Sequence, residues 1–233
     1  MAATDDLVYL GAQRLGDLRD EVVFVGGAVC GLLITDPGAP ATRSTDDVDV
    51  IIEVASAIEF HAFAARLRQR GIHEDPTSNV ICRFDAGGLK LDVMPISQVP
   101  LGFTNRWYPH VLRTAQPRLL DGDPPLGIRL ITATAFLATK CESYRGRGNG
   151  DPYHPDLEDI IAIVDGRPEI VDEASREDPT VRRFIAAEIS ELFEDDDAIR
   201  RQLPADATGD SRLVTVRDRI LQLTRHGGRI EGP

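Results

Sequence analysis

The sequence predicts an α/β fold, with a small mixed sheet flanked by helices and a helical C-terminal part. Two short runs, Val22–Val25 and Asp47–Glu53, have the length and the β-branched composition of strands. Amphipathic segments of helical periodicity accompany such runs in the first half of the chain. After Gly166 only helical patterns follow. We therefore expect two domains, an α/β domain over residues 1–130 and a mostly helical domain over residues 131–233.

Composition narrows the class of protein. The chain has 233 residues, of which 42% are hydrophobic, so a globular core is expected. Its net charge of −12 argues against non-specific binding to nucleic acid. There is no apolar run of membrane-spanning length and no signal-peptide pattern. The three cysteines lie in apolar segments without Cys-x-x-Cys spacing, which indicates reduced core residues of a cytoplasmic protein with no membrane partner.

The first elements surround a glycine pair. Asp5–Arg19 is expected to be a helix, and Val22–Val25 a buried strand that stops at Gly26 and Gly27. Ala28–Ile34 then reads as a short apolar helix. Glycine has no Cβ, so a phosphate can approach the backbone closely, and a helix start supplies free N–H groups.

Two acids enter the next strand one residue apart. Side chains alternate along a strand, so Asp47 and Asp49 face one side and Val48 and Val50 the other. Adjacent carboxylates repel each other, and a hard divalent cation such as Mg²⁺ would relieve that repulsion. The plain alternative is a pair of solvated acids at a strand entrance, because Asp-x-Asp is too short to be specific.

A third carboxylate strengthens the metal hypothesis. Ile81–Met94 reads as a hairpin with Gly87 and Gly88 near its turn. Asp92 lies in the middle of its second strand, among apolar residues. An unpaired buried charge is costly, so Asp92 needs a partner. A metal shared with the other two aspartates would be one.

Further helices follow. Ser56–Arg70 begins with a capping box formed by Ser56 and Glu59. The proline-rich stretch Val99–Gly127 reads as irregular, with a strand at Tyr108–Thr114. The C-terminal part is expected to be mainly helical over Glu173–Leu203 and Ser211–His226, and disordered over residues 227–233.

Two charged residues stand out on the later helices. Lys140 lies within an apolar stripe of Thr132–Tyr144, where its amine either reaches water past a packed stem or points at phosphates. Asp156 follows Pro155 at the start of a helix ending near Val164. Acids are favoured there by the helix dipole alone.

Together these motifs resemble the DNA polymerase β-type nucleotidyltransferase superfamily. The resemblance rests on the Gly-Gly turn, an Arg-x-Thr-x-Asp-x-Asp run and a later strand aspartate, at Gly26, Gly27, Arg43, Thr45, Asp47, Asp49 and Asp92. More narrowly the chain resembles the AbiEii/AbiGii toxin-like family, which adds a helical lysine and an aspartate that opens a later helix. Lys140 and Asp156 match those two places.

The resemblance implies a nucleotidyltransferase fold, with catalysis in residues 1–130, and an activity. It implies an enzyme that uses two Mg²⁺ ions and an NTP, with Asp47, Asp49 and Asp92 as metal ligands. It also implies that the triphosphate is held by Gly26, Gly27, Arg43, Thr45 and Lys140. Lys140 and Asp156 join the three metal ligands in the catalytic set.

Three functions remain open at this point. The family implies nucleotide addition to RNA, such as a tRNA 3′ end, by a toxin with a separate antitoxin protein. The alternative acceptor is a small molecule, as in aminoglycoside nucleotidyltransferases, and the charge of −12 favours a cationic acceptor. The third is a nucleotide-binding protein without turnover. P-loop, dinucleotide-binding and zinc-protease motifs are absent from the sequence.

Overall fold

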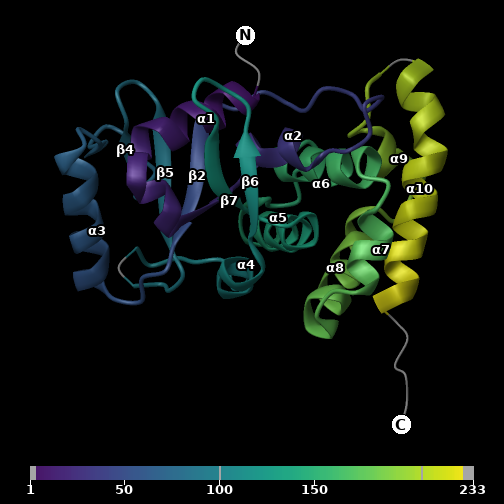
Figure 1. Cartoon of the computed structure of the whole chain (residues 1–233). Coiled ribbons are helices and arrows are strands. Elements are labelled where there is room, and N and C mark those ends of the chain that lie inside the picture. Colours follow the sequence, from purple (N-terminus) through teal and green to yellow (C-terminus); the bar gives the residue numbers. More distant parts are fainter. Residues whose placement is uncertain (1–3, 100, 206, 228–233) are drawn as a thin grey trace. The chain divides into compact units, whose positions relative to one another are not determined.

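The chain folds into two compact units, each described here by itself. A computed structural model describes residues 4–99, 101–205 and 207–227 (Figure 1). The first unit comprises Met1–Leu32 and Ser44–Thr132, and the second comprises Leu33–Arg43 and Ala133–Pro233. The chain therefore leaves the first unit once, over residues 33–43, before it returns to form the acidic strand. The expected domains, residues 1–130 and 131–233, stay a prediction.

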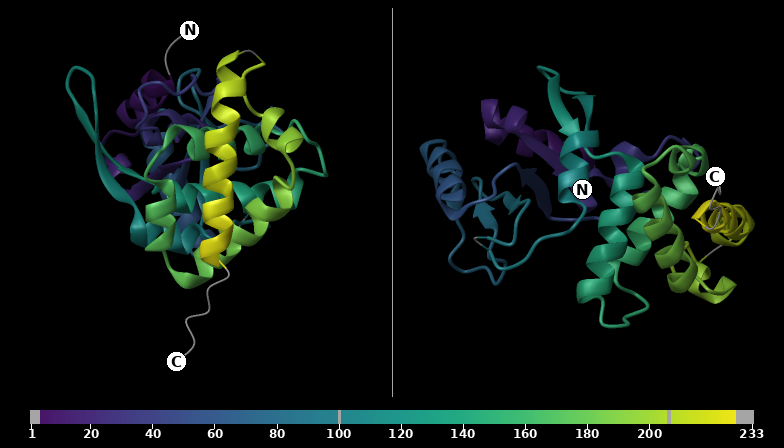
Figure 2. Two further views of the ribbon diagram at one scale, coloured as in Figure 1. Left: turned by 90° about the vertical axis from the view of Figure 1, so that its right-hand side faces the viewer. Right: turned by 90° about the horizontal axis from the view of Figure 1, so that it is seen from below.

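The first unit is built on a seven-stranded mixed sheet. Its strand order is β3-β4-β5-β2-β1-β7-β6, with β2 parallel to β5, β1 parallel to β7 and the other neighbours antiparallel. β7 pairs with β1 only at Leu130, so the β6–β7 hairpin extends away from the sheet (Figure 2). The strands are β1 (Val22–Val25), β2 (Asp47–Ile52), β3 (His73–Glu74), β4 (Arg83–Asp85), β5 (Lys90–Pro95), β6 (Gln116–Leu120) and β7 (Leu126–Leu130).

Helices flank this sheet, as the α/β prediction requires. The Ser56 hydroxyl accepts from the Glu59 N–H, and the Glu59 carboxylate accepts from the Ser56 N–H, which confirms the predicted capping box of α3. α1 ends at Leu15 rather than at Arg19, because Gly16 adopts a φ of +57° and a short 3₁₀ helix follows. The helical segments of this unit are α1 (Thr4–Leu15), η1 (Gly16–Glu21), η2 (Gly27–Val29), α2 (Cys30–Leu33), α3 (Ala57–Gln69) and α4 (Tyr108–Thr114).

Two predictions for residues 99–127 are wrong. The stretch was expected to be otherwise irregular, but Gln116–Leu120 and Leu126–Leu130 form the β6–β7 hairpin. Tyr108–Thr114 is helix α4, not a strand. Pro109 lies in its first turn, where the missing N–H costs nothing. Tyr108, Val111 and Leu112 are buried at helical spacing, so the segment packs as an amphipathic helix. Burial of this face against the rest of the unit favours the helix.

The second unit is helical, which confirms the predicted helical C-terminal part. α10 packs against α8, α7 and α6 and lies across them in the left view of Figure 2. Pro179 is in the first turn of α8, where Asp178 caps the helix. No described helix is long and apolar enough to cross a membrane. The helices are α5 (Ala133–Arg147), α6 (Pro155–Gly166), α7 (Ile170–Ser175), α8 (Pro179–Leu192), α9 (Asp196–Arg200) and α10 (Ala207–Gly227). Of residues 227–233, which were expected to be disordered, Gly227 ends α10, and 228–233 lie outside the described residues.

Residues 33–43, here called the strap, belong to the second unit through specific bonds. The carbonyl of Gly166, at the end of α6, accepts from the N–H groups of Thr35 and Asp36 at 3.0 and 2.9 Å. Arg167 donates to the Leu33 carbonyl, and Arg212 of α10 donates to the Asp36 carboxylate. These main-chain and charged contacts fix the start of the strap, where Leu33 is also buried.

Candidate functional site

Three predicted metal ligands come together on one face of the sheet. Asp49 of β2 and Asp92 of β5 are direct partners in the register of these parallel strands. Asp47 lies two residues before Asp49, on the same face, and the residues that alternate with them, Val48 and Val50, are fully buried. The predicted alternation along β2 is therefore confirmed. Three carboxylates of one strand pair lie within a short stretch of one surface.

The glycine turn lies against this carboxylate group. β1 pairs antiparallel to β2, with Val25 opposite Asp49, so Gly26 follows directly beside Asp49. Gly26 has φ +74° and ψ −170°, which a residue with a Cβ rarely adopts. A Cβ at this position would also collide with the Asp49 carboxylate. Glycine is therefore required at residue 26 both by the backbone conformation and by the close approach of Asp49.

Arg83 is the positive charge of the site, and the sequence reasoning missed it. From β4, directly opposite Asp92, its Nε donates to Asp92 Oδ1 at 2.8 Å and its Nη2 to Asp92 Oδ2 at 2.8 Å. Nη2 also donates to Asp47 Oδ2 at 2.7 Å. These hydrogen bonds, chiefly those with Asp92, raise the pKa of Arg83, so it stays charged. One guanidinium thus bridges two of the three predicted metal ligands.

Neighbouring polar groups complete this region. The Thr45 hydroxyl donates to Asp47 Oδ1 at 2.6 Å, so Thr45 orients one of the carboxylates. Lys90 pairs with Asp46 on the exposed side. That pair lowers the pKa of Asp46, mainly through its hydrogen bond with Lys90. Lys90, one of only two lysines, is therefore engaged outside the carboxylate group.

The donor set fits a hard divalent cation in its chemistry, because all three ligands are carboxylates. Their present arrangement fits a guanidinium instead. Arg83 holds both oxygens of Asp92 and one of Asp47. Within the described residues, no group of three or more His, Cys, Asp and Glu side chains is arranged to hold a metal ion. A metal at this face would therefore require a change at Arg83.

The second unit brings together the other predicted residues. Lys140 of α5 is 6% exposed, and its Nζ lies 3.0 Å from Asp156 Oδ1 and 2.6 Å from Asp159 Oδ2. Burial alone would lower the pKa of Lys140, but the two carboxylates outweigh it and raise the pKa above its ordinary value. Lys140 is thus a charged, buried ammonium held by two acids of α6.

Asp156 sits where the sequence predicts, at the start of α6. His154 caps the helix, because its Nδ1 accepts from the Asp156 N–H at 3.2 Å. The carboxylate pairs with Lys140 and with Arg147, at 3.0 and 3.1 Å. Burial would raise the pKa of Asp156, and the charges of Lys140 and Arg147 nevertheless hold it below its ordinary value.

Asp159 is the second residue that the sequence reasoning missed. Arg43, at the end of the strap, donates to Oδ1 and Oδ2 at 2.9 and 3.0 Å, and Lys140 Nζ also pairs with Oδ2. Asp159 is 1% exposed, so it is a buried carboxylate shared by two cations. The spacing Asp156-x-x-Asp159 on one helix face was the available signal. Four predicted or newly found residues of the second unit therefore form one ion-pair network.

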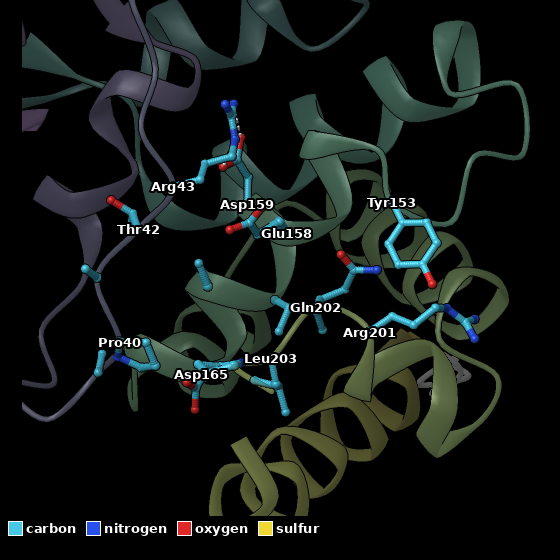
Figure 3. A pocket seen from close by; sticks show the side chains of 15 residues that line it. Pro40, Thr42, Arg43, Tyr153, Glu158, Asp159, Asp165, Arg201, Gln202 and Leu203 are labelled. Carbon is cyan, nitrogen blue, oxygen red and sulfur yellow. Dashed lines mark hydrogen bonds and ion pairs between the residues drawn. The ribbon is translucent and has the colours of Figure 1, made fainter. Parts of the chain in front are cut away.

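A cavity of about 290 Å³ lies beside this network in the second unit (Figure 3). Arg43 and Asp159 are joined at its edge, and Glu158 lies next to them. Glu158 is largely exposed, yet partial burial and the neighbouring Asp159 raise its pKa. The rest of the lining comes mostly from the strap, α6 and the segment after α9, including Pro40, Ala41, Tyr153, Ile161, Ala162, Asp165, Arg201, Gln202 and Leu203.

Comparisons with known proteins add one structural likeness. No protein-family model and no curated protein matches the sequence. A crystal structure of ANT(2″)-Ia in complex with adenylyl-2″-tobramycin is similar, with a TM-score of 0.42 and 12% sequence identity. The alignment covers 80% of this chain and 98% of that one. At this degree of likeness, the function of the chain must be argued from its own residues.

Proposed function

We propose that this chain is a Mg²⁺-dependent nucleotidyltransferase that moves an NMP from an NTP to an acceptor hydroxyl. The observation that supports this most directly is the register of β2 and β5, which sets Asp49 opposite Asp92 with Asp47 on the same face. Such a group of carboxylates needs positive charge, and Mg²⁺ takes oxygen ligands. The motif resemblance supports the same chemistry.

The motif resemblance supplies the proposed roles of the three aspartates. Asp47 and Asp49 would hold both Mg²⁺ ions, and Asp92 one of them. When bound, the ions would neutralise phosphate charge and orient the reacting oxygens. An Asp92 oxygen would accept the proton of the acceptor hydroxyl. The acceptor oxygen forms a bond to the α-phosphorus, the bond from that phosphorus to the pyrophosphate oxygen breaks, and pyrophosphate leaves.

The motif resemblance also supports a set of residues that would hold the triphosphate. In that set Gly26 and Gly27 would supply the turn, with the Asp49 carboxylate in the space beside Gly26, and Thr45 supports Asp47 through its hydroxyl. Arg43 and Lys140 would neutralise phosphate charge. In that role their pairing with Asp159 would hold both cations in orientation, and Asp156 would do the same for Lys140.

RNA is the first proposed acceptor. The toxin-like family resemblance supports addition of a nucleotide to RNA, for example at a tRNA 3′ end, with an antitoxin protein as partner. A small cationic molecule is the second, supported by the net charge of −12, which attracts cations and repels polyanions. The third proposal, a nucleotide-binding protein without turnover, is disfavoured by the complete set of three aspartates.

A labelling assay tests these proposals together. The protein, Mg²⁺ and each of the four α-labelled NTPs are incubated with total RNA in one tube and with an aminoglycoside panel in another. Label on RNA supports the first acceptor, and label on a small molecule the second. Asp49→Ala should abolish either product. Asp46→Ala, which removes an exposed acid paired with Lys90, should leave the rate unchanged.

Binding of NTP without product in any tube would favour the third proposal. The same binding should then depend on Mg²⁺ and be lost in Asp49→Ala. If Asp49→Ala keeps the transfer rate of the unaltered chain, the proposed metal site is wrong.

A further inference from the structure

Arg83 occupies the place of a cation within the proposed metal site. It lies on β4 directly opposite Asp92, and its side chain is only 14% exposed. Its fork makes two hydrogen bonds to Asp92 and one to Asp47, all between 2.7 and 2.8 Å. A bidentate pair of this kind is among the stronger charge-assisted contacts in proteins. The guanidinium therefore balances the negative charge of two carboxylates that lie partly buried beside one another.

A divalent cation shared by Asp47 and Asp92 needs oxygens that the guanidinium now holds. Arg83 Nη2 contacts both Asp92 Oδ2 and Asp47 Oδ2, so it lies between the two carboxylates. A metal ion placed there would be close to a positive charge, and like charges repel strongly where water is partly excluded. The Arg83 guanidinium and the metal ion therefore cannot both lie between these two carboxylates.

We propose that Arg83 and the divalent cation compete for Asp47 and Asp92, so that Arg83 is the counter-ion of the metal-free protein and sets its metal affinity. This inference rests on the proposed function, because it concerns the same carboxylates. Arg83 is in this view a positioning residue. It keeps the ligands in place when no metal is bound and withdraws as the metal enters.

Metal binding measured directly on the full chain tests the competition. Mn²⁺, a hard divalent cation, is titrated calorimetrically into the unaltered chain, Arg83→Gln and Arg66→Gln. Arg66 is the matched control, because it also forms a bidentate pair, with Glu21 of the same unit, but touches none of the three aspartates. Arg83→Gln should bind Mn²⁺ at least about tenfold more tightly, since the metal no longer has to break the charge-assisted hydrogen bonds of Arg83 with the carboxylates. Arg66→Gln should bind as the unaltered chain does.

Thermal unfolding supplies a second readout that a purely structural role would not give. Without metal, Arg83→Gln should unfold at a lower temperature, because its carboxylates lose their counter-ion. Saturating Mn²⁺ should close this gap, because the metal binds the folded state and replaces the lost charge. The smaller decrease in unfolding temperature of Arg66→Gln should be the same with and without metal.

Arg83→Lys covers the case in which Arg83→Gln does not fold. Lysine keeps the charge but cannot make the bidentate fork, so its Mn²⁺ affinity should be higher than that of the unaltered chain. Equal or weaker Mn²⁺ binding in both Arg83 variants would overturn the competition while leaving the metal site in place. If the unaltered chain shows no Mn²⁺ binding that is lost in Asp49→Ala, the proposed metal site is wrong, and the competition falls with it.

Discussion

The backbone of Gly26 lies so close to the carboxylate of Asp49 that a Cβ on residue 26 would overlap with it. This contact joins the end of β1 to the acidic strand β2 at the middle of the proposed site. Gly26 therefore does more than end a strand, because it leaves the space in which the carboxylate lies. The sequence predicted a glycine turn here but assigned its open side to a phosphate.

Gly26→Ala should thus be strongly destabilising. The backbone conformation at φ +74° and ψ −170° is almost exclusive to glycine, and the new methyl group would have to displace Asp49. We expect a loss of more than about 3 kcal/mol in the free energy of unfolding, measured with urea, from strain and collision together. Gly71→Ala is the control, since Gly71 has a similar φ of +78° and open space around it.

Gly71→Ala should lose only about 1–2 kcal/mol, the strain of a positive φ alone. Similar losses in the two variants would mean that Asp49 moves aside without cost, and the contact would then not define the site.

Local patterns made part of this structure predictable. The capping box at Ser56 needs only residues three apart, and the alternation along β2 needs only the period of a strand. The predicted strand at Tyr108–Thr114 is wrong, because the buried residues of this segment recur at helical spacing. The period of its buried residues was the better guide.

Arg83 was accessible to the same kind of reasoning. The β4–β5 hairpin is symmetric about Gly87 and Gly88, so the residue opposite Asp92 is Arg83. Extending the hairpin prediction by its register would have found the partner that the buried acid required. The fold of the strap was not accessible, because residues 33–43 are held by the Gly166 carbonyl and by Arg212, both far away in sequence. No local pattern encodes those bonds.

The two lysines of the chain offer a matched comparison. Lys140 is buried between Asp156 and Asp159, whereas Lys90 pairs with Asp46 in an exposed position. Lys140→Met should cost about 3–5 kcal/mol in the free energy of unfolding, because two buried acids lose a shared cation. Lys90→Met should cost at most about 1 kcal/mol, as exposed pairs contribute little. Urea unfolding of both variants at neutral pH measures the difference.

Removal of one of the two acids should partly rescue the first variant. Lys140→Met combined with Asp159→Asn leaves fewer buried charges unpaired, so the two losses should not add. Additive losses would indicate that Lys140 and Asp159 do not interact in solution.

The three cysteines should be inert in the folded protein. All are buried, at 0–2% exposure. Burial, assisted by the charges of Asp92 and Asp49, raises the pKa of Cys82 to about 12, and burial also raises the pKa of Cys141. Thiolate is the reactive form, so reaction with a disulfide reagent at pH 8 should be about 100-fold slower than for an unfolded chain. In denaturant all three thiols should become reactive. A thiol that reacts rapidly without denaturant would contradict the buried placement.

Glu158, at the edge of the cavity, should make stability depend on pH in a defined direction. Its folded pKa is raised by burial and by Asp159, from an unfolded value of about 4.3. Below that value the group is protonated in both states and carries no penalty. As pH rises through the higher folded pKa, ionisation is less favourable in the folded state, and stability is lost.

Glu158→Gln should therefore be more stable than the unaltered chain at pH 7 and equal to it near pH 3. The gain should be only roughly a few tenths of a kcal/mol, because the carboxylate is largely exposed and water screens its repulsion from Asp159. Urea unfolding at the two pH values measures it, with Glu191→Gln on the exposed side of α8 as control. A gain that is the same at both pH values would mean that the charge of Glu158 is not its source, since an uncharged effect of the substitution does not titrate.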